Sequence, residues 1–365
     1  MTKLRSLTSG GRLPLIEITH IVSVFLLCGV AVVPLLRGVS PCTHDGGLHY
    51  YRVVAIRHTL GKGLFFTRWL PDFAFGYGFP FFNYRAPLSY YLGVGFHLVG
   101  LSLPLALNLV YVSSILGSAM GAYLFSRDLF GSRAGMVAAV AYAYAPYQFL
   151  NALVRGNAPE SVALALLPFI LWAFRRLALR GDRWWFLVSV GLLAGLYLTH
   201  NISSLLFTPF LLAYLVVLWW VHRERGEWKL VTLALVLALG LTAFFWFPAL
   251  AEKGYVQLYL TGATRNNDFH YNFLTFFEVF APPEAVDMSL INPPLKIKLG
   301  LVQTVLAAAG LAIGLAFSTN RSGAARKKRD QAGDKSIGCQ GAQERRVTLL
   351  FFAVSASLLV FMSTS

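Results

Sequence analysis

Asp45 is the acidic residue whose neighbours and position best suit chemistry. It lies in the segment THDGGLHYYR, between His44 and His49 and shortly before Arg52, a few residues beyond the first apolar run. A carboxylate at such an edge is partly desolvated, which raises its basicity, while neighbouring cations moderate the shift. Asp45 is therefore a candidate for acid–base chemistry. The simpler interpretation is a helix cap, because Asp and Gly commonly precede a helix start.

Two further polar segments lie at the ends of apolar runs. Arg155, Asn157 and Glu160 share the segment RGNAPE, and His200 lies in THN. On the topology proposed below, both segments open on the side where Asp45 emerges. Simpler roles exist here too: Glu160 follows a proline and can complement a helix N-terminus, and His200 can end a helix with its ring satisfied by the backbone.

His44 and His49 are five residues apart with Asp45 between them, so a metal site can be imagined. Clustered Cys and His ligands at familiar spacings are lacking on this side. Three cysteines, Cys28, Cys42 and Cys339, imply no disulfide framework. We assign no metal site and no cofactor; a divalent metal is compatible with the sequence but not indicated by it.

The composition indicates that these residues are positioned by a membrane-embedded chain. The 365 residues are 56% hydrophobic and 13% charged, whereas soluble domains carry about 25% charged residues. Apolar runs long enough to cross a bilayer recur along the chain. The net charge of +15 could suggest nucleic acid, but the basic residues sit in short loops between these runs, so we expect a lipid bilayer as partner and no nucleic acid.

The predicted fold is an all-α, polytopic transmembrane helix bundle of about nine spans, without a soluble catalytic domain. The first apolar run is too long for a signal peptide and lacks a cleavage site, so we predict an uncleaved helix. The predicted spans cover residues 15–36, 104–126, 133–151, 159–178, 184–199, 202–221, 229–250, 298–318 and 347–365.

We treat residues 1–365 as one transmembrane domain with three long connections. These are a first outside loop at 37–103 with interfacial helices, a second outside loop at 251–297 and a basic, mobile cytoplasmic loop at 319–346. Because residue 365 falls within an apolar run, we expect a C-terminally truncated chain.

The distribution of basic residues predicts a cytoplasmic N-terminus in the inner (plasma) membrane. Of the 31 Lys and Arg residues, 20 are predicted to lie on the same side of the membrane as the N-terminus and 11 on the other side, as the positive-inside rule requires. The stretch RAPLSYYLGVGFHLVGLSLP is predicted to be interfacial or re-entrant, because a tenth span would reverse every later loop. The aromatic run FAFGYGFPFFNYR suggests an interfacial belt, with a sugar or lipid platform as the alternative.

Several segments together carry a family resemblance: HDGGLHYYRVVAIRHTL, RWLPDFAFGYGFPFFNYRAPLSYYL, RGNAPESVALALLPF, LTHNISSLL and FFWFPALAEKGYVQ. They resemble bacterial multi-spanning membrane proteins labelled "6-pyruvoyl-tetrahydropterin synthase-related", over most of residues 15–300. That group is similar in layout to the GT-C glycosyltransferases, which use polyprenyl-phosphate sugars. Its members run well past residue 365. The label names the pterin chemistry of a soluble enzyme, and the predicted membrane spans contradict that activity.

The resemblance implies a membrane glycosyltransferase, because GT-C enzymes place an essential acidic residue in the first outside loop, where Asp45 lies. Asp45 would act as general base on an acceptor hydroxyl attacking the anomeric carbon, and cations would stabilise the departing lipid phosphate. The expected partners are a polyprenyl-phosphate-linked sugar and a glycan, lipid or protein acceptor. Arg155 is the best-placed cation, and the other substrate-binding candidates are Arg85, Lys253, Glu160, His200, Asn157 and His44.

Two other functions fit a bundle of this kind. A transporter or lipid-carrier flippase predicts ionisable residues near the middle of the spans, and the apolar runs hold almost none apart from Glu17 and His20. That favours a site at the outer interface. A noncatalytic membrane subunit is the third alternative.

Overall fold

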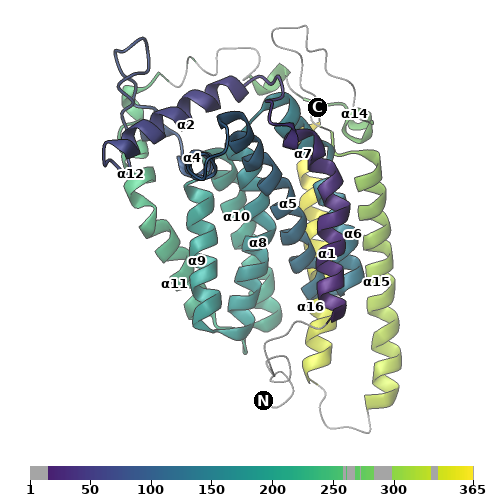
Figure 1. The fold of residues 1–365 in the computed structure, drawn as a ribbon. Helices are drawn as coiled ribbons and strands as arrows, with labels where there is room; N and C mark the ends of the chain where they lie inside the picture. Colours follow the sequence, from purple (N-terminus) through teal and green to yellow (C-terminus); the bar gives the residue numbers. More distant parts are fainter. Residues whose placement is uncertain are drawn as a thin grey trace.

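The computed structural model describes residues 15–257, 260, 268–271, 273–282, 298–329 and 336–364. These residues form a bundle of long helices with shorter helices gathered at one end (Figure 1). The described part of the chain is built from helices, which confirms the all-α prediction.

Five helices are long and apolar enough to cross a bilayer, and a sixth span is formed if a bent pair is counted as one. The pair, α11 (Trp228–Leu241) and α12 (Ala243–Ala251), bends by 63°. α9 (Arg183–Tyr197) and the Leu301–Ala316 part of α15 are apolar but shorter. Nine spans are therefore not confirmed for the described residues. The five are Leu15–Arg37, which joins α1 (Leu15–Gly29) to η2 (Val30–Arg37), α5 (Leu103–Phe130), α8 (Ala158–Arg180), α10 (Asn201–His222) and the Gly341–Ser363 part of α16 (Ser336–Ser363).

The predicted span 133–151 is wrong as a single helix. The chain forms α6 (Ser132–Ala143), α7 (Pro146–Phe149) and a π-helical turn, η3 (Leu150–Arg155). Ala145, before the proline, has an extended backbone with φ −61° and ψ 133°, because a proline ring disfavours the helical conformation of the preceding residue. This break brings η3 to the end of the bundle where α2 lies.

The predicted basic loop 319–346 is largely helical instead. α15 (Leu301–Arg329) continues into it, and α16 already begins at Ser336. Sixteen of the 28 residues in 319–346 are Ala, Arg, Lys, Gln or Glu, all of which favour helices, so the polarity of this segment does not imply a loop.

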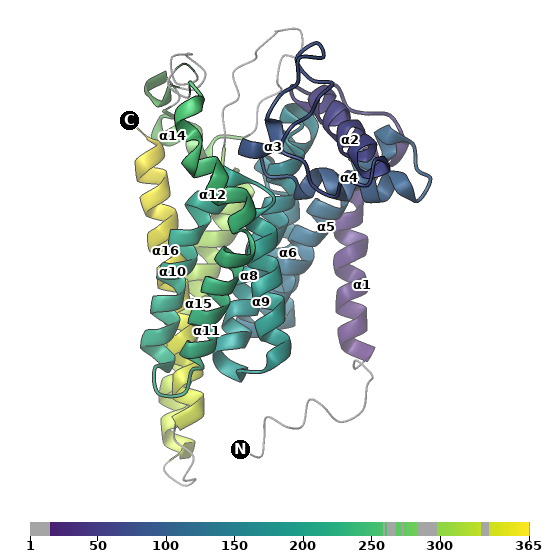
Figure 2. The same cartoon turned by 90° about the vertical axis from the view of Figure 1, so that its left-hand side faces the viewer.

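The first long connection folds into three helices: α2 (Gly46–Gly61), α3 (Phe81–Tyr84) and α4 (Leu88–Leu98). Figure 2 shows them together beyond the ends of the long helices. α4 has 11 residues, about 17 Å of helix at 1.5 Å per residue, which is far short of the roughly 30 Å of a hydrocarbon core. The structure therefore agrees with an interfacial element rather than a tenth span.

Small residues let the central helices approach closely. The missing side chain of Gly121 in α5 leaves room for Pro168 and Phe169 of α8, and Gly135 of α6 lies against the backbone of Tyr123. Inside a bilayer, close packing rather than the hydrophobic effect drives helix association. The α5–α6–α8 contacts thus form a rigid base for the residues at the α2 end.

The opposite end of the bundle carries a buried charge network. Arg176 pairs with Asp128, and Arg175 pairs with both Asp128 at 3.6 Å and Glu344 at 2.6 Å. Asp128 and Glu344 are only 6% and 5% exposed, so the pairs lie inside the protein. Arg127 of α5 pairs with Glu17 of α1. The helices therefore hold more ionisable residues than expected from the apolar runs, but near their ends.

Candidate functional site

The segment carrying Asp45 is hydrogen-bonded to η3. The backbone N–H of His44 donates to the carbonyl of Val154 at 3.0 Å, and that of Asp45 donates to the carbonyl of Arg155 at 2.8 Å. Gly156 ends η3 with φ +69°, and a Cβ there would lie 2.9 Å from the Gly46 nitrogen and even closer to the Thr43 hydroxyl. Only glycine suits this contact. Asp45 and Arg155 thus come from distant segments to one place.

Asp45 occupies the N-cap position of α2, but its carboxylate makes no capping hydrogen bond. The Thr43 hydroxyl accepts from the Gly46 N–H instead, at 3.1 Å. The carboxylate is half-buried and has no hydrogen bond or ion pair with any described residue. It lies within electrostatic range of Arg155, Tyr90 and Tyr111. The cap interpretation is right for its position and wrong for its side chain.

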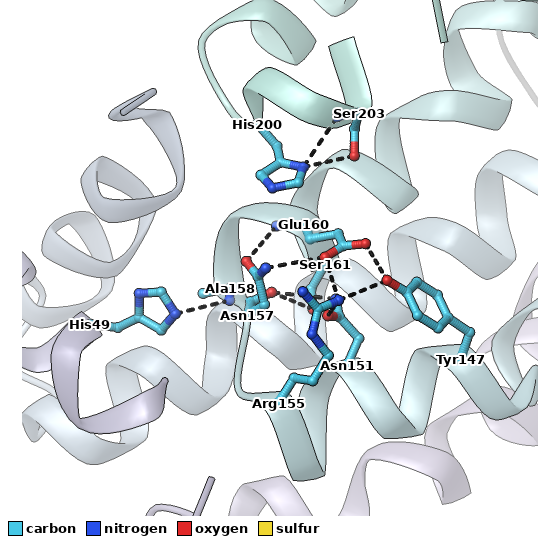
Figure 3. Close-up of polar contacts among 10 residues, drawn as sticks. All are labelled: His49, Tyr147, Asn151, Arg155, Asn157, Ala158, Glu160, Ser161, His200 and Ser203. Carbon is cyan, nitrogen blue, oxygen red and sulfur yellow. Dashed lines mark hydrogen bonds and ion pairs between the residues drawn. The ribbon is translucent and has the colours of Figure 1, made fainter. Parts of the chain in front are cut away.

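Arg155 and Glu160 form the centre of a polar cluster at the start of α8 (Figure 3). The Arg155 guanidinium donates to Glu160 Oε2 and to the Tyr147 hydroxyl, both at 2.8 Å. Tyr147 in turn donates to Glu160 Oε1. Asn157 caps α8 by accepting from the Glu160 N–H at 3.2 Å, and its amide donates to Glu160 Oε2 at 3.1 Å. Both carboxylate oxygens of Glu160 and Nη1 of Arg155 are therefore already engaged.

His200 lies beside this cluster as the N-cap of α10 (Figure 3). Its Nδ1 accepts from the Ser203 N–H at 3.3 Å and contacts the Ser203 hydroxyl at 2.8 Å, so the neutral ring carries its proton on Nε2. Burial lowers the pKa of His200, with Glu160 opposing that effect. The helix-end interpretation is thus correct, and Nε2–H has no partner among the described residues.

Three of the sequence candidates are exposed: Arg85, His44 and Lys253. None has a side-chain hydrogen bond to a described residue. Arg85 lies within electrostatic range of His200 and of His49, so it lies in the same region as the cluster. Lys253 follows Glu252, whose carboxylate accepts from Asn83 at 2.8 Å, which ties the end of α12 to α3.

His49 is a buried neighbour of Asp45. It is 2% exposed, with Nδ1 3.1 Å from an Arg52 nitrogen and Nε2 3.4 Å from the Ala158 backbone nitrogen. Burial, together with the Arg52 cation, lowers the pKa of His49 to about 3. Both ring nitrogens of His49 lie near N–H groups, and His44 is exposed.

Sequence reasoning missed Tyr147 and Asn151, which support Arg155 from the preceding turn. Asn151 Oδ1 lies 3.5 Å from the Arg155 guanidinium, and its amide donates to Ser161 at 3.0 Å. Residues 147, 151 and 155 are spaced four apart, the spacing that places side chains on one face of a helix. That spacing was a usable signal. Arg52 donates to the Tyr90 hydroxyl at 2.9 Å. It follows His49 by three residues, a spacing that also places two side chains on one face of a helix.

The arrangement separates a fixed ion pair from groups that are free to react. Arg155, Glu160, Tyr147 and Asn157 hold one another, whereas the carboxylate of Asp45 and the guanidinium of Arg85 have no described partner. A half-buried carboxylate without a partner can accept a proton. An exposed arginine can bind an anion such as phosphate.

Comparisons with known proteins give one family and a few distant relatives. A family model described as "6-pyruvoyl-tetrahydropterin synthase related domain; membrane protein" matches residues 82–284. An uncharacterized protein of Lactococcus lactis subsp. cremoris (strain MG1363) is 23% identical over 261 residues, which cover 68% of this chain and 42% of that protein.

Two solved structures of Archaeoglobus fulgidus are similar at 15% identity. The archaeal oligosaccharyltransferase AglB, in complex with an inhibitory peptide and a dolichol-phosphate, has a TM-score of 0.49, over 96% of this chain and 39% of AglB. The oligosaccharyltransferase in the apo form has a TM-score of 0.48, over 93% of this chain and 51% of that one. The chain thus spans about half or less of the length of these proteins.

Proposed function

The chain belongs to the 6-pyruvoyl-tetrahydropterin synthase-related family of membrane proteins, and from this premise we propose that it is a membrane glycosyltransferase. It would move a sugar from a polyprenyl-phosphate donor to an acceptor at the outer face of the inner membrane. The supporting observation is the half-buried carboxylate of Asp45, which has no described partner and is held beside Arg155 by the Asp45 N–H bond of 2.8 Å.

Asp45 would act as the general base. The acceptor hydroxyl must lose its proton as its oxygen attacks the anomeric carbon, while the bond from that carbon to the phosphate oxygen breaks. The proton passes to the Asp45 carboxylate, and the polyprenyl phosphate leaves with the bonding electrons. Direct displacement of this kind inverts the anomeric centre.

Arg85 is a better candidate than Arg155 for binding the departing phosphate. The charge of Arg155 is balanced by Glu160, and its guanidinium is held by Tyr147. Arg85 is exposed, has no described side-chain partner and lies within electrostatic range of His200. We therefore assign the anion to Arg85, with Lys253 near it, and give Arg155, Glu160 and Asn157 the role of holding the segment beneath Asp45.

The buried network of Asp128, Arg175 and Glu344 does not favour transport. Transport predicts ionisable residues near the middle of the spans. Arg175 and Asp128 lie close to the ends of α8 and α5, and their charges are mutually paired. Such pairs fit a role in holding helices together.

The test is transfer by the full-length protein reconstituted in lipid vesicles. The vesicles receive polyprenyl phosphates carrying radiolabelled hexoses, and membranes from cells lacking the protein supply the acceptor. We expect label to leave the lipid donor with release of polyprenyl phosphate, and heat-inactivated protein to show none. Movement of the intact donor across the bilayer without cleavage would contradict the proposal and support a flippase.

A further inference from the structure

A hollow lies at the far end of α2, away from Asp45. It has a volume of about 240 Å³ and lies between the last turns of α2 and the chain from Lys62 to Phe73. This is below the roughly 300–1,000 Å³ of pockets that take drug-sized molecules. The hollow therefore suits one ring-sized group and not a larger ligand.

An indole ring forms one wall of this hollow. Trp69 is 50% exposed, and Gly78, at φ +83°, lies so close to the ring that a Cβ would contact three of its atoms. The backbone of Gly78 thus covers part of the indole, while half of the residue's surface stays exposed, and Trp69 is among the residues that line the hollow. The antiparallel bridge between Leu70 and Phe79 fixes this approach. A supported aromatic face of this kind offers a flat apolar surface.

Groups of both charges line the hollow around the indole. His58 contacts Asp72 at 3.3 Å, and their side chains are 50% and 69% exposed. Lys62, Thr59 and Thr67 complete the polar lining. The Asp72 carboxylate would repel a phosphate, whereas hydroxyl groups can donate to Asp72 and accept from Lys62. The lining therefore favours a neutral, polyhydroxylated ring over an anion.

The hollow is too remote from Asp45 to hold the sugar that reacts. Asp45 occupies the position before the first residue of α2 and His58 lies thirteen residues further along, about 20 Å at 1.5 Å per residue. We propose that the hollow is a saccharide subsite that binds one pyranose ring of a longer glycan, stacked on Trp69 with its hydroxyls on Asp72 and Lys62. This inference rests on the proposed function, since it names a glycan as the extended substrate.

The experiment measures binding of methyl glycosides of glucose, mannose, galactose and N-acetylglucosamine to the full-length protein in lipid nanodiscs, by saturation-transfer NMR. We expect at least one glycoside to bind. Trp69→Ala should weaken that binding about 10-fold. Asp72→Asn, at an exposed position that should not affect folding, should weaken it as well. Trp184→Ala removes another exposed indole (65% exposed) and should change nothing.

The outcomes separate this subsite from the catalytic proposal. Asp45→Asn should leave glycoside binding unchanged. Transfer activity therefore tests the catalytic proposal, and glycoside binding tests the subsite independently. Absence of binding for all four glycosides, or equal binding by the wild type, Trp69→Ala and Asp72→Asn, would overturn the subsite. Quenching of Trp69 fluorescence by brominated phosphatidylcholine without glycoside binding would overturn it too, and would identify Trp69 as a membrane anchor.

Discussion

Charged residues at the α2 end of the bundle differ in whether their side chains already have a partner. Arg155 and Glu160 satisfy each other, with Tyr147 and Asn157 completing their hydrogen bonds. Asp45 and Arg85 have no described side-chain partner. Removing a member of the first pair should cost stability, because a partly buried partner is left unsatisfied. Removing one of the free residues should cost function instead.

Arg85→Ala tests this distinction for the anion. A hydrogen bond to a charged group contributes about 1.5–3 kcal/mol, so the variant should bind a polyprenyl-phosphate donor roughly 10–100-fold more weakly, with an unchanged melting temperature. The measurement is donor binding by the purified protein, followed with a labelled donor. Arg57→Ala, an exposed arginine of α2 without a described side-chain partner, is the control. Equal losses in both variants would contradict a specific role for Arg85.

The buried imidazole of His49 predicts a pH dependence of stability. The pKa of His49 is lowered from 6.5 to about 3 in the folded protein, so between these values the unfolded chain binds a proton that the folded one does not. Stability therefore falls as pH falls below 6.5, by about 2 kcal/mol between pH 6.5 and 5. Thermal unfolding across pH 5–8 should show this decline in the wild type and less of it in His49→Gln.

Exposed His44 is the matched control for that titration. His44→Gln should show the same decline of stability with falling pH as the wild type. A slope that is identical in all three proteins would mean that His49 does not titrate as its burial requires.

At the scale of elements, the site depends on the contact between the Asp45 segment and η3. Gly156→Ala would place a methyl group against Thr43 and Gly46. Gly38→Ala meets the same backbone strain, at φ +71°, but has nothing within 4 Å. We expect Gly156→Ala to lower the free energy of unfolding by about 1–3 kcal/mol more than Gly38→Ala, and to slow transfer about 10²-fold through misplacement of Asp45.

Chemical denaturation and transfer rates of the two glycine variants check this prediction side by side. If the two variants behave alike, the effect comes from the backbone conformation of alanine alone. The close contact of Gly156 with the Asp45 segment would then have no part in positioning the carboxylate.

The sequence was informative where physical rules act locally. Apolar runs located most of the long helices, and Asn157 and His200 cap helices as their positions suggest. The break in 133–151 was missed because its 19 residues satisfy the apolar length criterion, although Pro146 disfavours a helical backbone at Ala145. The hydrogen bonds from His44 and Asp45 to Val154 and Arg155 join segments about 110 residues apart, and no local pattern reports such a contact.

At the scale of the whole molecule, the polar groups are divided between the two ends of the bundle. α2 crosses one end of the bundle, and α1 begins at the other (Figure 1). Asp45 precedes α2 and is hydrogen-bonded to Arg155, with His200 beside the Arg155 cluster (Figure 3). Asp128, which pairs with Arg175, follows Arg127, and Arg127 pairs with Glu17 in the first turn of α1. The count of Lys and Arg residues in the predicted loops assigned those loops to the same two sides. It could not report that Arg175 and Arg176 are partly buried and paired, because pairing depends on helices distant in sequence.

The outward direction of the α2 end can be tested with a native residue. Cys42 is exposed beside the Asp45 segment, whereas Cys28 is buried. If the N-terminus is cytoplasmic, a membrane-impermeant maleimide added to intact cells should label the protein, and Cys42→Ser should abolish that labelling. Labelling of Cys42 only after permeabilisation would place the Asp45 segment on the cytoplasmic side and contradict the proposed orientation.

The most direct test of the account is the turnover of Asp45→Asn with a labelled polyprenyl-phosphate sugar. The amide keeps the size of the side chain and cannot accept the proton, so transfer should fall about 10²–10⁴-fold. The melting temperature should stay unchanged, because the carboxylate has no described partner. Glu224→Gln, an exposed carboxylate in the turn after α10, should retain full activity. Equal turnover by Asp45→Asn and the wild type would contradict the assignment of Asp45 as the base.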